Sequence, residues 1–176
     1  MRKIFGHRGL PQIYIENTIK SLNKALEICD FVETDLRITK DEQLIFYHDP
    51  TIKNKKIEEL TLSEIKTFID IDISEIHFVS RDQIKGRANF ELKVNNDENE
   101  LNKIFINKVT NLTKQDDIIS SFDWETILNN REKFKSRYGI LIDKENQLFE
   151  SKAISNLDPK LMFMVEKEIF YSRNFE

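Results

Sequence analysis

The chain has 176 residues, of which 39% are hydrophobic and 33% charged, and its formal net charge is −4. This length suits one domain spanning 1–176, and the interspersed acids and bases disfavour a nucleic-acid partner, which attracts clustered basic residues. The longest apolar stretches are far too short to cross a bilayer, and no apolar segment typical of a signal peptide follows Arg2 and Lys3. We therefore expect a cytoplasmic protein without a membrane span.

Apolar patterns in the first fifty residues predict three strands and one helix. The helix contains Ile19, Leu22 and Leu26 at helical spacing and begins after Asn17 or Thr18, either of which can cap it. A polar turn joins the second strand to the third. The expected strands are 3–6, 31–38 and 44–48.

The rest of the chain alternates strands with helices after an irregular stretch. Residues 49–88 are charged and weakly periodic, with one short helix opened by Thr61 or Ser63. Strands are expected at 89–94, 117–121, 138–143 and 161–165, and helices at 98–112, 124–134 and 147–154. Such alternation predicts right-handed βαβ units and a parallel sheet, hence an α/β fold.

Two of the predicted strands carry acidic residues on one face. Glu33 and Asp35 lie about 7 Å apart on the same side of their strand, and Glu91 and Lys93 share a side of the next one, because strand side chains alternate. Three carboxylates that converge need a cation, and oxygen ligands favour Mg²⁺ or Ca²⁺, with Mn²⁺ possible. The alternative is a set of solvated charges on a half-exposed antiparallel sheet.

Two histidines, His7 and His48, each end a predicted strand. Two imidazoles beside a metal suit displacement at phosphorus, in which one removes a proton from the nucleophile and the other protonates the leaving alkoxide. Arg8 and Lys93 would pair with the phosphate charge. Taken singly, either histidine is more simply a hydrogen-bonded structural residue, and we interpret His77 as a surface residue.

Together these segments resemble the glycerophosphodiester phosphodiesterase family over roughly residues 3–95. The resemblance rests on the order of five motifs: His7-Arg8-Gly9, Glu16-Asn17-Thr18, Glu33-x-Asp35, His48-Asp49 and Glu91-x-Lys93. The segment Ser120-Ser121-Phe122-Asp123 resembles the family less specifically.

The resemblance implies a TIM-type barrel with a small insertion, residues 49–88, after the second strand. It also implies metal-dependent hydrolysis of a small glycerophosphodiester to glycerol 3-phosphate and an alcohol, within glycerol and lipid metabolism. Carried over by motif, the metal ligands would be Glu33, Asp35 and Glu91, the acid-base pair His7 and His48, and the phosphate ligands Arg8 and Lys93. Glu16 and Asn17 would line the site, unless Asn17 only caps the helix.

The chain also departs from the family pattern. An eight-stranded barrel needs about 250 residues, whereas only six main strands are predicted here, so we expect an incomplete barrel of about six βα units. Asn54-Lys55-Lys56 stands where the family has Arg-Thr. The apolar tail from Glu166 would seal the open side or pack in a homodimer. Two alternatives stay open: a lyase-like relative that forms a cyclic phosphate, and a non-catalytic remnant that binds metal or a phosphate ligand.

Overall fold

The computed structural model describes residues 3–68, 81–94, 100–154, 156 and 158–165. Within these residues seven strands form one sheet in the order β1-β2-β6-β7-β8-β9, with β3 paired to β2. Every neighbouring pair is parallel except β2 and β3, which are antiparallel. The strands are β1 (Phe5–Gly6), β2 (Phe31–Ile38), β3 (Leu44–Phe46), β6 (Arg87–Leu92), β7 (Ile118–Ser121), β8 (Arg137–Ile142) and β9 (Leu161–Val165).

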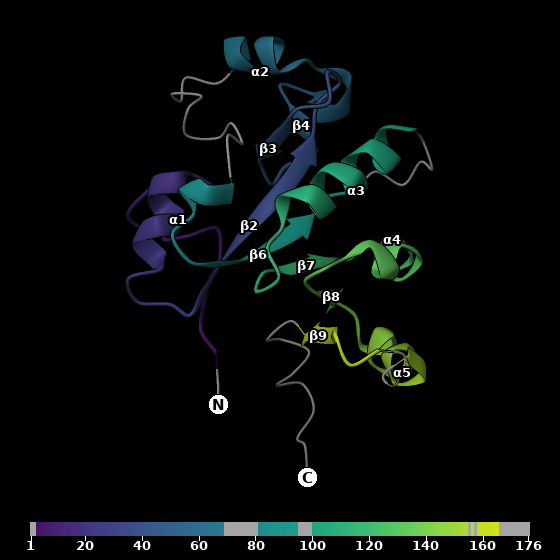
Figure 1. The fold of residues 1–176 in the computed structure, drawn as a ribbon. Helices are drawn as coiled ribbons and strands as arrows, with labels where there is room; N and C mark the ends of the chain where they lie inside the picture. Colours follow the sequence, from purple (N-terminus) through teal and green to yellow (C-terminus); the bar gives the residue numbers. More distant parts are fainter. Residues whose placement is uncertain (1–2, 69–80, 95–99, 155, 157, 166–176) are drawn as a thin grey trace.

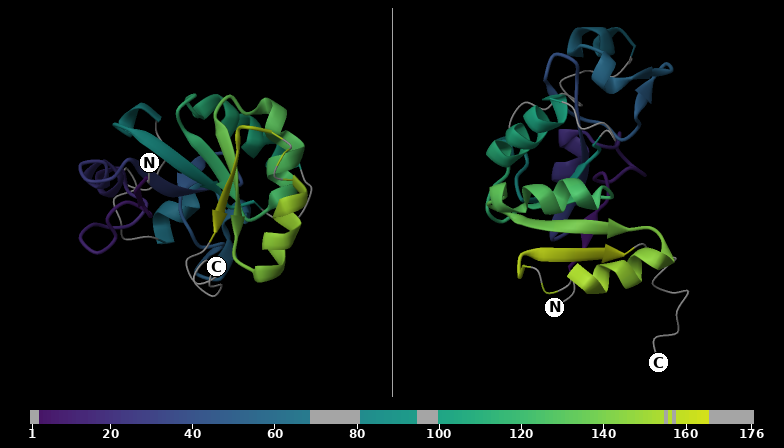
Figure 2. Two further views of the ribbon diagram at one scale, coloured as in Figure 1. Left: turned by 90° about the horizontal axis from the view of Figure 1, so that it is seen from below. Right: turned by 90° about the vertical axis from the view of Figure 1, so that its right-hand side faces the viewer.

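The sheet curls, and its helices follow the outer side of the curve (Figures 1 and 2). They are α1 (Ile19–Ala25), α3 (Glu100–Leu112), α4 (Trp124–Asn130), which continues into the 3₁₀ turn η3 (Arg131–Lys133), and α5 (Glu145–Ile154). This half-barrel of six parallel strands with crossover helices confirms the predicted α/β class and the incomplete TIM-type barrel.

The outer face of the sheet carries the main hydrophobic core. Val32 and Leu36 of β2 and Phe90 of β6 point to this face and are fully buried, against Leu22 of α1 and Phe105 of α3. Each such side chain contributes roughly 1.5–3 kcal/mol when fully buried. Because this face takes up these apolar residues of β2 and β6, the alternate residues of the two strands must line the inner face.

Side-chain caps fix where two helices begin. Thr18, and not Asn17, caps α1, because its side chain accepts a hydrogen bond from the Ser21 amide at 3.2 Å. Thr61 caps α2 (Leu62–Phe68) in a reciprocal capping box, in which the Thr61 and Glu64 side chains each accept from the other's backbone amide. Asn17 is therefore released from capping and is available to the inner face of the sheet.

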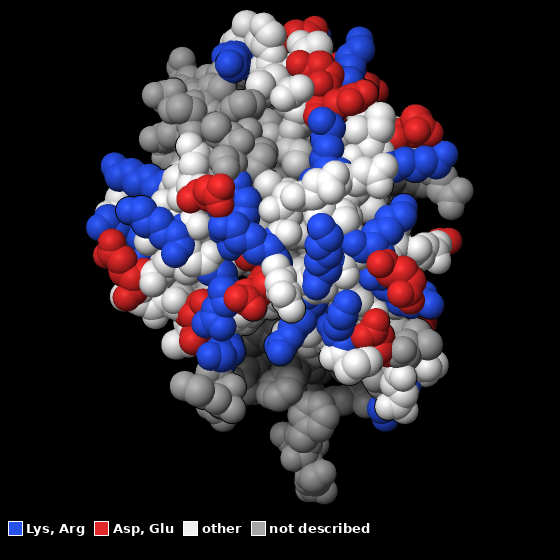
Figure 3. Space-filling view, viewed as in Figure 1, with Lys and Arg blue, Asp and Glu red and all other residues white. Residues whose placement is uncertain are grey.

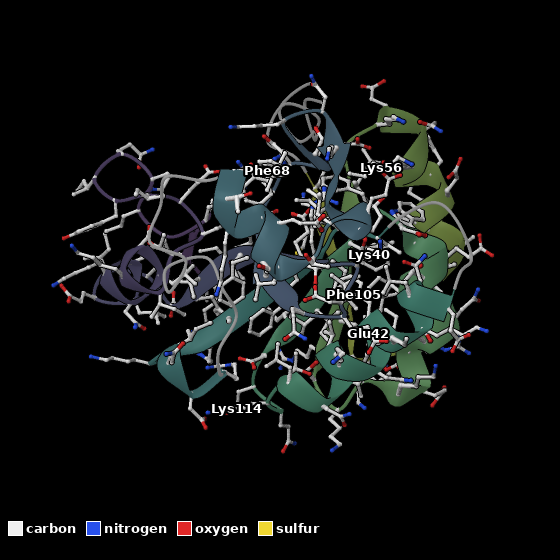
Figure 4. All side chains as sticks on the ribbon, turned by 90° about the horizontal axis from the view of Figure 1, so that it is seen from above. Lys40, Glu42, Lys56, Phe68, Phe105 and Lys114 are labelled. Carbon is white, nitrogen blue, oxygen red and sulfur yellow. The ribbon has the colours of Figure 1, made fainter. Side chains whose placement is uncertain are left out.

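Residues 49–68 are more regular than we predicted. They form a hairpin of β4 (Thr51–Ile52) and β5 (Lys55–Lys56), the 3₁₀ turn η1 (Ile57–Glu59) and α2. Together with β3 they enclose a second apolar cluster of Ile45, Ile52, Ile57, Leu60 and Ile65. Phe68 of α2, labelled in the view from above in Figure 4, packs against this cluster. The Lys53 and Lys55 ammonium groups lie 5.6 and 5.7 Å from the centre of the Phe68 ring.

Several element ends differ from the predicted ones. β1 begins at Phe5 instead of Lys3, and it stops at Gly6 as predicted, because the chain turns there, with the Gly9 amide bonded to the Gly6 carbonyl and Arg8 at φ 54°. β3 stops at Phe46 instead of His48, and β6 begins at Arg87, after the 3₁₀ turn η2 (Arg81–Gln83). The predicted positions of His77 and of the tail from Glu166 lie outside the described residues.

The surface shown in Figure 3 carries intermingled basic and acidic side chains. Among the described helices, none is both long and apolar enough to cross a membrane.

Candidate active site

The two predicted histidines converge because β1 and β3 lie on the same edge of β2. β1 pairs with the beginning of β2 and runs towards its middle, while β3 pairs with its end and runs back towards the same point. The chain therefore leaves β1 at His7 and leaves β3 at His48 beside the middle of β2. Two backbone contacts mark the meeting point: the Arg8 amide donates to Glu33 Oε2 at 3.0 Å, and the Tyr47 amide donates to the Asp35 carbonyl at 3.1 Å.

Three carboxylates meet on the inner face of the sheet at this point. Asp35 and Glu91 are register partners on β2 and β6, and Glu33 lies two residues before Asp35. One carboxylate oxygen from each lies within 4.8 Å of the others, and all three residues are at most 7% exposed. Burial, followed by repulsion from Asp35 and Glu91, raises the pKa of Glu33 well above its ordinary value, and burial also raises the pKa of Glu91.

Two carboxylate oxygens of this cluster that accept no hydrogen bond indicate whether the cluster suits a cation. Glu33 Oε1 is buried and accepts no hydrogen bond within the described part of the chain, and the buried Asp35 Oδ1 accepts none there either, although it lies 3.1 Å from the Lys93 ammonium. A buried carboxylate oxygen that lacks a hydrogen bond is unfavourable, and a hard divalent cation that binds oxygen ligands offsets that cost. The geometry therefore fits the predicted metal.

Two basic side chains neutralise part of this charge. Lys93 Nζ lies 3.1 Å from Asp35 Oδ1 and also donates to Glu91 Oε1, and Arg8 Nε lies 3.2 Å from Asp35 Oδ2. Arg8 Nη1 also donates to Glu16 at 3.1 Å. Both predicted phosphate ligands are thus held at the carboxylates, and Glu16 is placed behind Arg8.

Asn17 connects the loop after β1 to the carboxylates. Its Nδ2 donates to Asp35 Oδ2 at 2.9 Å, and its Oδ1 accepts from Thr34 Oγ1 at 2.8 Å and from the Asp35 amide at 3.1 Å. Asn17 is 2% exposed and adopts φ 58°, a conformation that asparagine tolerates better than most residues. Asn17 therefore fixes the rotamer of Asp35.

Replacing Asn17 with alanine is expected to destabilise the fold by about 2–4 kcal/mol, because three buried hydrogen bonds lose their partner. Metal affinity should fall about 10-fold or more, since Asp35 loses its orientation. Urea unfolding and calorimetric titration with Mg²⁺ measure the two effects. Asn130→Ala, which removes a half-buried amide bonded to the Thr126 carbonyl at 2.9 Å, is the control for stability alone. An Asn17→Ala protein that binds metal as well as the control would contradict the orienting role.

The two histidines face the same cavity in different electrostatic surroundings. His7 Nε2 lies 3.7 Å from Glu33 Oε2, and His48 Nδ1 lies 2.9 Å from Asp49 Oδ1. Partial desolvation by the cavity wall, reinforced by Arg8, lowers the pKa of His7. His7 is thus favoured in its neutral form at neutral pH. Asp49 orients the His48 ring, because an ionised carboxylate can only accept a hydrogen bond from it.

The inner face opens into a cavity of about 560 Å³ beside the carboxylates. His7, Arg8, His48 and Lys93 line its polar side, and Phe5, Met162 and Met164 lie on its apolar side. A second hollow of about 690 Å³ shares Glu91, Lys93 and Phe122 with it and extends to Trp124 and Gln147. Lys93 therefore borders both spaces, whereas Arg8 lines only the first.

Sequence reasoning missed two polar residues of the inner face. Asn89, the register partner of Glu33, lines the cavity and leaves its Oδ1 without a hydrogen bond in the described part of the chain. Arg37, two residues after Asp35, is 7% exposed and donates two hydrogen bonds to the His48 carbonyl. The alternation that identified Glu33 and Asp35 extends to both positions and could have found them.

The model of the "Glycerophosphoryl diester phosphodiesterase family" matches residues 7–95. The chain is similar to a lysophospholipase D of Homo sapiens, with 31% identity over 134 residues that cover 65% of this chain and 42% of that protein. It is also similar to a glycerophosphodiester phosphodiesterase of Caldanaerobacter subterraneus subsp. tengcongensis, with 35% identity over 69 residues, 36% of this chain and 28% of that protein. The matched part is thus less than half the length of these curated relatives.

Solved structures give longer matches. A glycerophosphodiester phosphodiesterase of Thermotoga maritima superposes with a TM-score of 0.66 at 30% identity, covering 93% of this chain and 74% of that one. A phosphodiesterase of Oleispira antarctica in complex with the product sn-glycerol-3-phosphate superposes with a TM-score of 0.71 at 18% identity, covering 93% and 75%.

Proposed function

We propose a function for this chain from one premise, that it belongs to the glycerophosphoryl diester phosphodiesterase family. It hydrolyses a small glycerophosphodiester, with one divalent cation at Glu33, Asp35 and Glu91. Bound there, the cation would polarise a phosphoryl oxygen and offset the negative charge that develops in the reaction. The observation that carries the proposal is the convergence of three buried carboxylates beside a cavity that two histidines line.

Arg8 and Lys93 hold the phosphate in this proposal. Both line the cavity and are ion-paired with the carboxylates. When a cation neutralises the carboxylates, the positive charges of Arg8 and Lys93 become available to the two non-bridging phosphate oxygens. Arg8 can offer its guanidinium while Glu16 holds it from behind.

The histidines divide the proton transfers between them. His7, whose pKa is lowered, accepts a proton from the attacking water, and His48, held by Asp49, donates one to the oxygen of the leaving alcohol. The P–O bond to the alcohol breaks as the bond to the water oxygen forms. Glycerol 3-phosphate and the alcohol are released.

Turnover of glycerophosphodiesters with and without added Mg²⁺ or Ca²⁺, followed by phosphorus NMR, tests the proposal. We expect glycerol 3-phosphate only when the cation is present. A cyclic phosphate as the final product would instead support the lyase-like alternative. Metal binding by calorimetry without any turnover would support a non-catalytic protein.

The carboxylate cluster also predicts how the cation affects stability at different pH values. Folding raises the pKa of Glu33 above its ordinary value of 4.5. At pH values between 4.5 and the raised pKa, the folded state therefore binds more protons than the unfolded state. The stability of the metal-free protein should therefore fall as pH rises through this window. A bound cation requires ionised ligands, so its stabilisation should be about 2.7 kcal/mol at 100 times Kd and pH 8, and smaller at pH 5.

Differential scanning calorimetry with and without Mg²⁺ at the two pH values measures this effect. Glu33→Gln is the control, because it removes the titrating group and should flatten the pH dependence of the metal-free protein. An Mg²⁺-induced shift in Tm of equal size at pH 5 and pH 8 would contradict the prediction.

A further inference from the structure

Arg37 is a buried cation on the inner face of β2 that the proposed reaction does not use. Its Nε and Nη2 both donate to the carbonyl oxygen of His48, at 3.0 and 2.7 Å. The carboxylates of Glu58, Asp35, Asp49 and Glu91 oppose the desolvation that lowers the pKa of Arg37, and a guanidinium stays charged in proteins. A buried guanidinium that donates two hydrogen bonds to one carbonyl oxygen fixes both the position and the orientation of that carbonyl group.

The contact lies where the backbone leaves the sheet. β3 ends at Phe46, and Tyr47 still bonds to the Asp35 carbonyl, so His48 is the second residue beyond the strand. Its carbonyl is held by Arg37 and its ring Nδ1 by Asp49. The backbone and the ring of His48 are thus fixed by two different groups, which leaves Nε2 as the ring atom that faces the reaction.

We propose that Arg37 is a positioning residue that aims His48 at the leaving alcohol. This inference rests on the proposed function, in which His48 delivers the proton. It requires that Arg37 act through the His48 backbone and bind neither metal nor phosphate. The loss of Arg37 should therefore impair only the step that needs a well-placed acid.

Two glycerophosphodiesters that differ in their leaving group separate the protonation of the leaving alcohol from the other steps. Glycerophosphocholine has a poor leaving group and needs an acid, whereas the p-nitrophenyl ester of glycerol 3-phosphate has a good one and does not. Arg37→Met should lower kcat about 10- to 100-fold on the first substrate and change it less than about 3-fold on the second. Arg37→Lys, which keeps the charge and one donor, should recover part of the loss.

Matched measurements exclude a merely structural effect. Arg87→Met removes a half-exposed arginine that lies over the Phe31 ring at the opposite end of the sheet, and it should leave kcat unchanged on both substrates. Mg²⁺ affinity of Arg37→Met should not fall below that of the unchanged protein. Equal losses on both substrates, a weakened metal site, or a raised KM with kcat intact would each overturn the proposal.

A measurement that does not require turnover tests the role of Arg37 independently of the proposed function. In proton–nitrogen correlation spectra of the histidine rings, Arg37→Met should shift the signals of His48 and leave those of His7 in place. Unchanged His48 signals would overturn the positioning role even in an inactive protein. No turnover by the unchanged protein on either substrate would instead refute the proposed function.

Discussion

Glu91→Gln is expected to abolish divalent-cation binding at the inner face and to lower turnover of glycerophosphodiesters about 10²-fold or more. Glu91 is the register partner of Asp35, and the three carboxylates place one oxygen each within 4.8 Å of the others. Glutamine keeps the size of the side chain but loses the charge that a hard cation requires. Isothermal titration with Mg²⁺ and Ca²⁺ and steady-state kinetics at saturating cation measure the two effects.

An exposed glutamate provides the control for this substitution. Glu132→Gln removes the same charge at an exposed position that is ion-paired with its neighbour Arg131 at 3.6 Å, so metal affinity and turnover should stay unchanged. If Glu91→Gln bound the cation as tightly as the Glu132→Gln protein, the carboxylate cluster would not be the metal site. If binding were lost and turnover kept, the reaction would not depend on that cation.

His7→Ala and His48→Ala should each lower turnover of an alkyl glycerophosphodiester about 10²- to 10⁴-fold, since each removes one proton transfer. Their responses to the leaving group should differ. With a p-nitrophenyl leaving group, which departs without protonation, the His48→Ala protein should recover most of its turnover. The His7→Ala protein should stay impaired, because the attacking water still needs a base.

The pH dependence of turnover gives an independent check on the same roles. The lowered pKa of His7 places the ascending limb of the profile for kcat/KM below pH 6.5, and the His7→Ala protein should lose that limb. Recovery of both variants to the same extent on the p-nitrophenyl substrate would refute distinct roles. Recovery of His7→Ala alone would reverse the assignment of acid and base.

The acidic cluster could be predicted because it depends on one rule. Side chains alternate along a strand, so Glu33 and Asp35 had to share a face, and parallel neighbours in register bring Glu91 beside them. The same rule left the apolar residues of these strands for the outer core, where the structure has them. The predicted roles of the site residues remain proposals, whereas their proximity is a property of the fold.

The convergence of His7 and His48 could not be predicted from local pattern. It depends on β3 pairing with the same edge of β2 as β1, which is a long-range choice. The role of Asn17 was equally hidden, because Asn and Thr are both good caps and the structure gives the cap to Thr18.

The cluster above β3 escaped prediction for a different reason. Its apolar members, Ile45, Ile52, Ile57, Leu60 and Ile65, come from a strand, a hairpin, a 3₁₀ turn and a helix in succession. Their spacing matches neither the period of a strand nor that of a helix, so periodicity analysis gives no signal. Only the packed structure shows that they belong together.

The second cluster divides the chain into parts that need not open together. His48 lies between Ile45 and Ile52, both members of that small cluster, whereas the carboxylates are carried by strands of the large core. Units with separate cores exchange their amide hydrogens at different rates. We therefore expect amides of residues 47–65 to exchange faster than those of β2 and β6, at a rate that cation binding leaves largely unchanged. In that partly opened state the protein would still bind its cation, but His48, the proposed general acid, would no longer be in place.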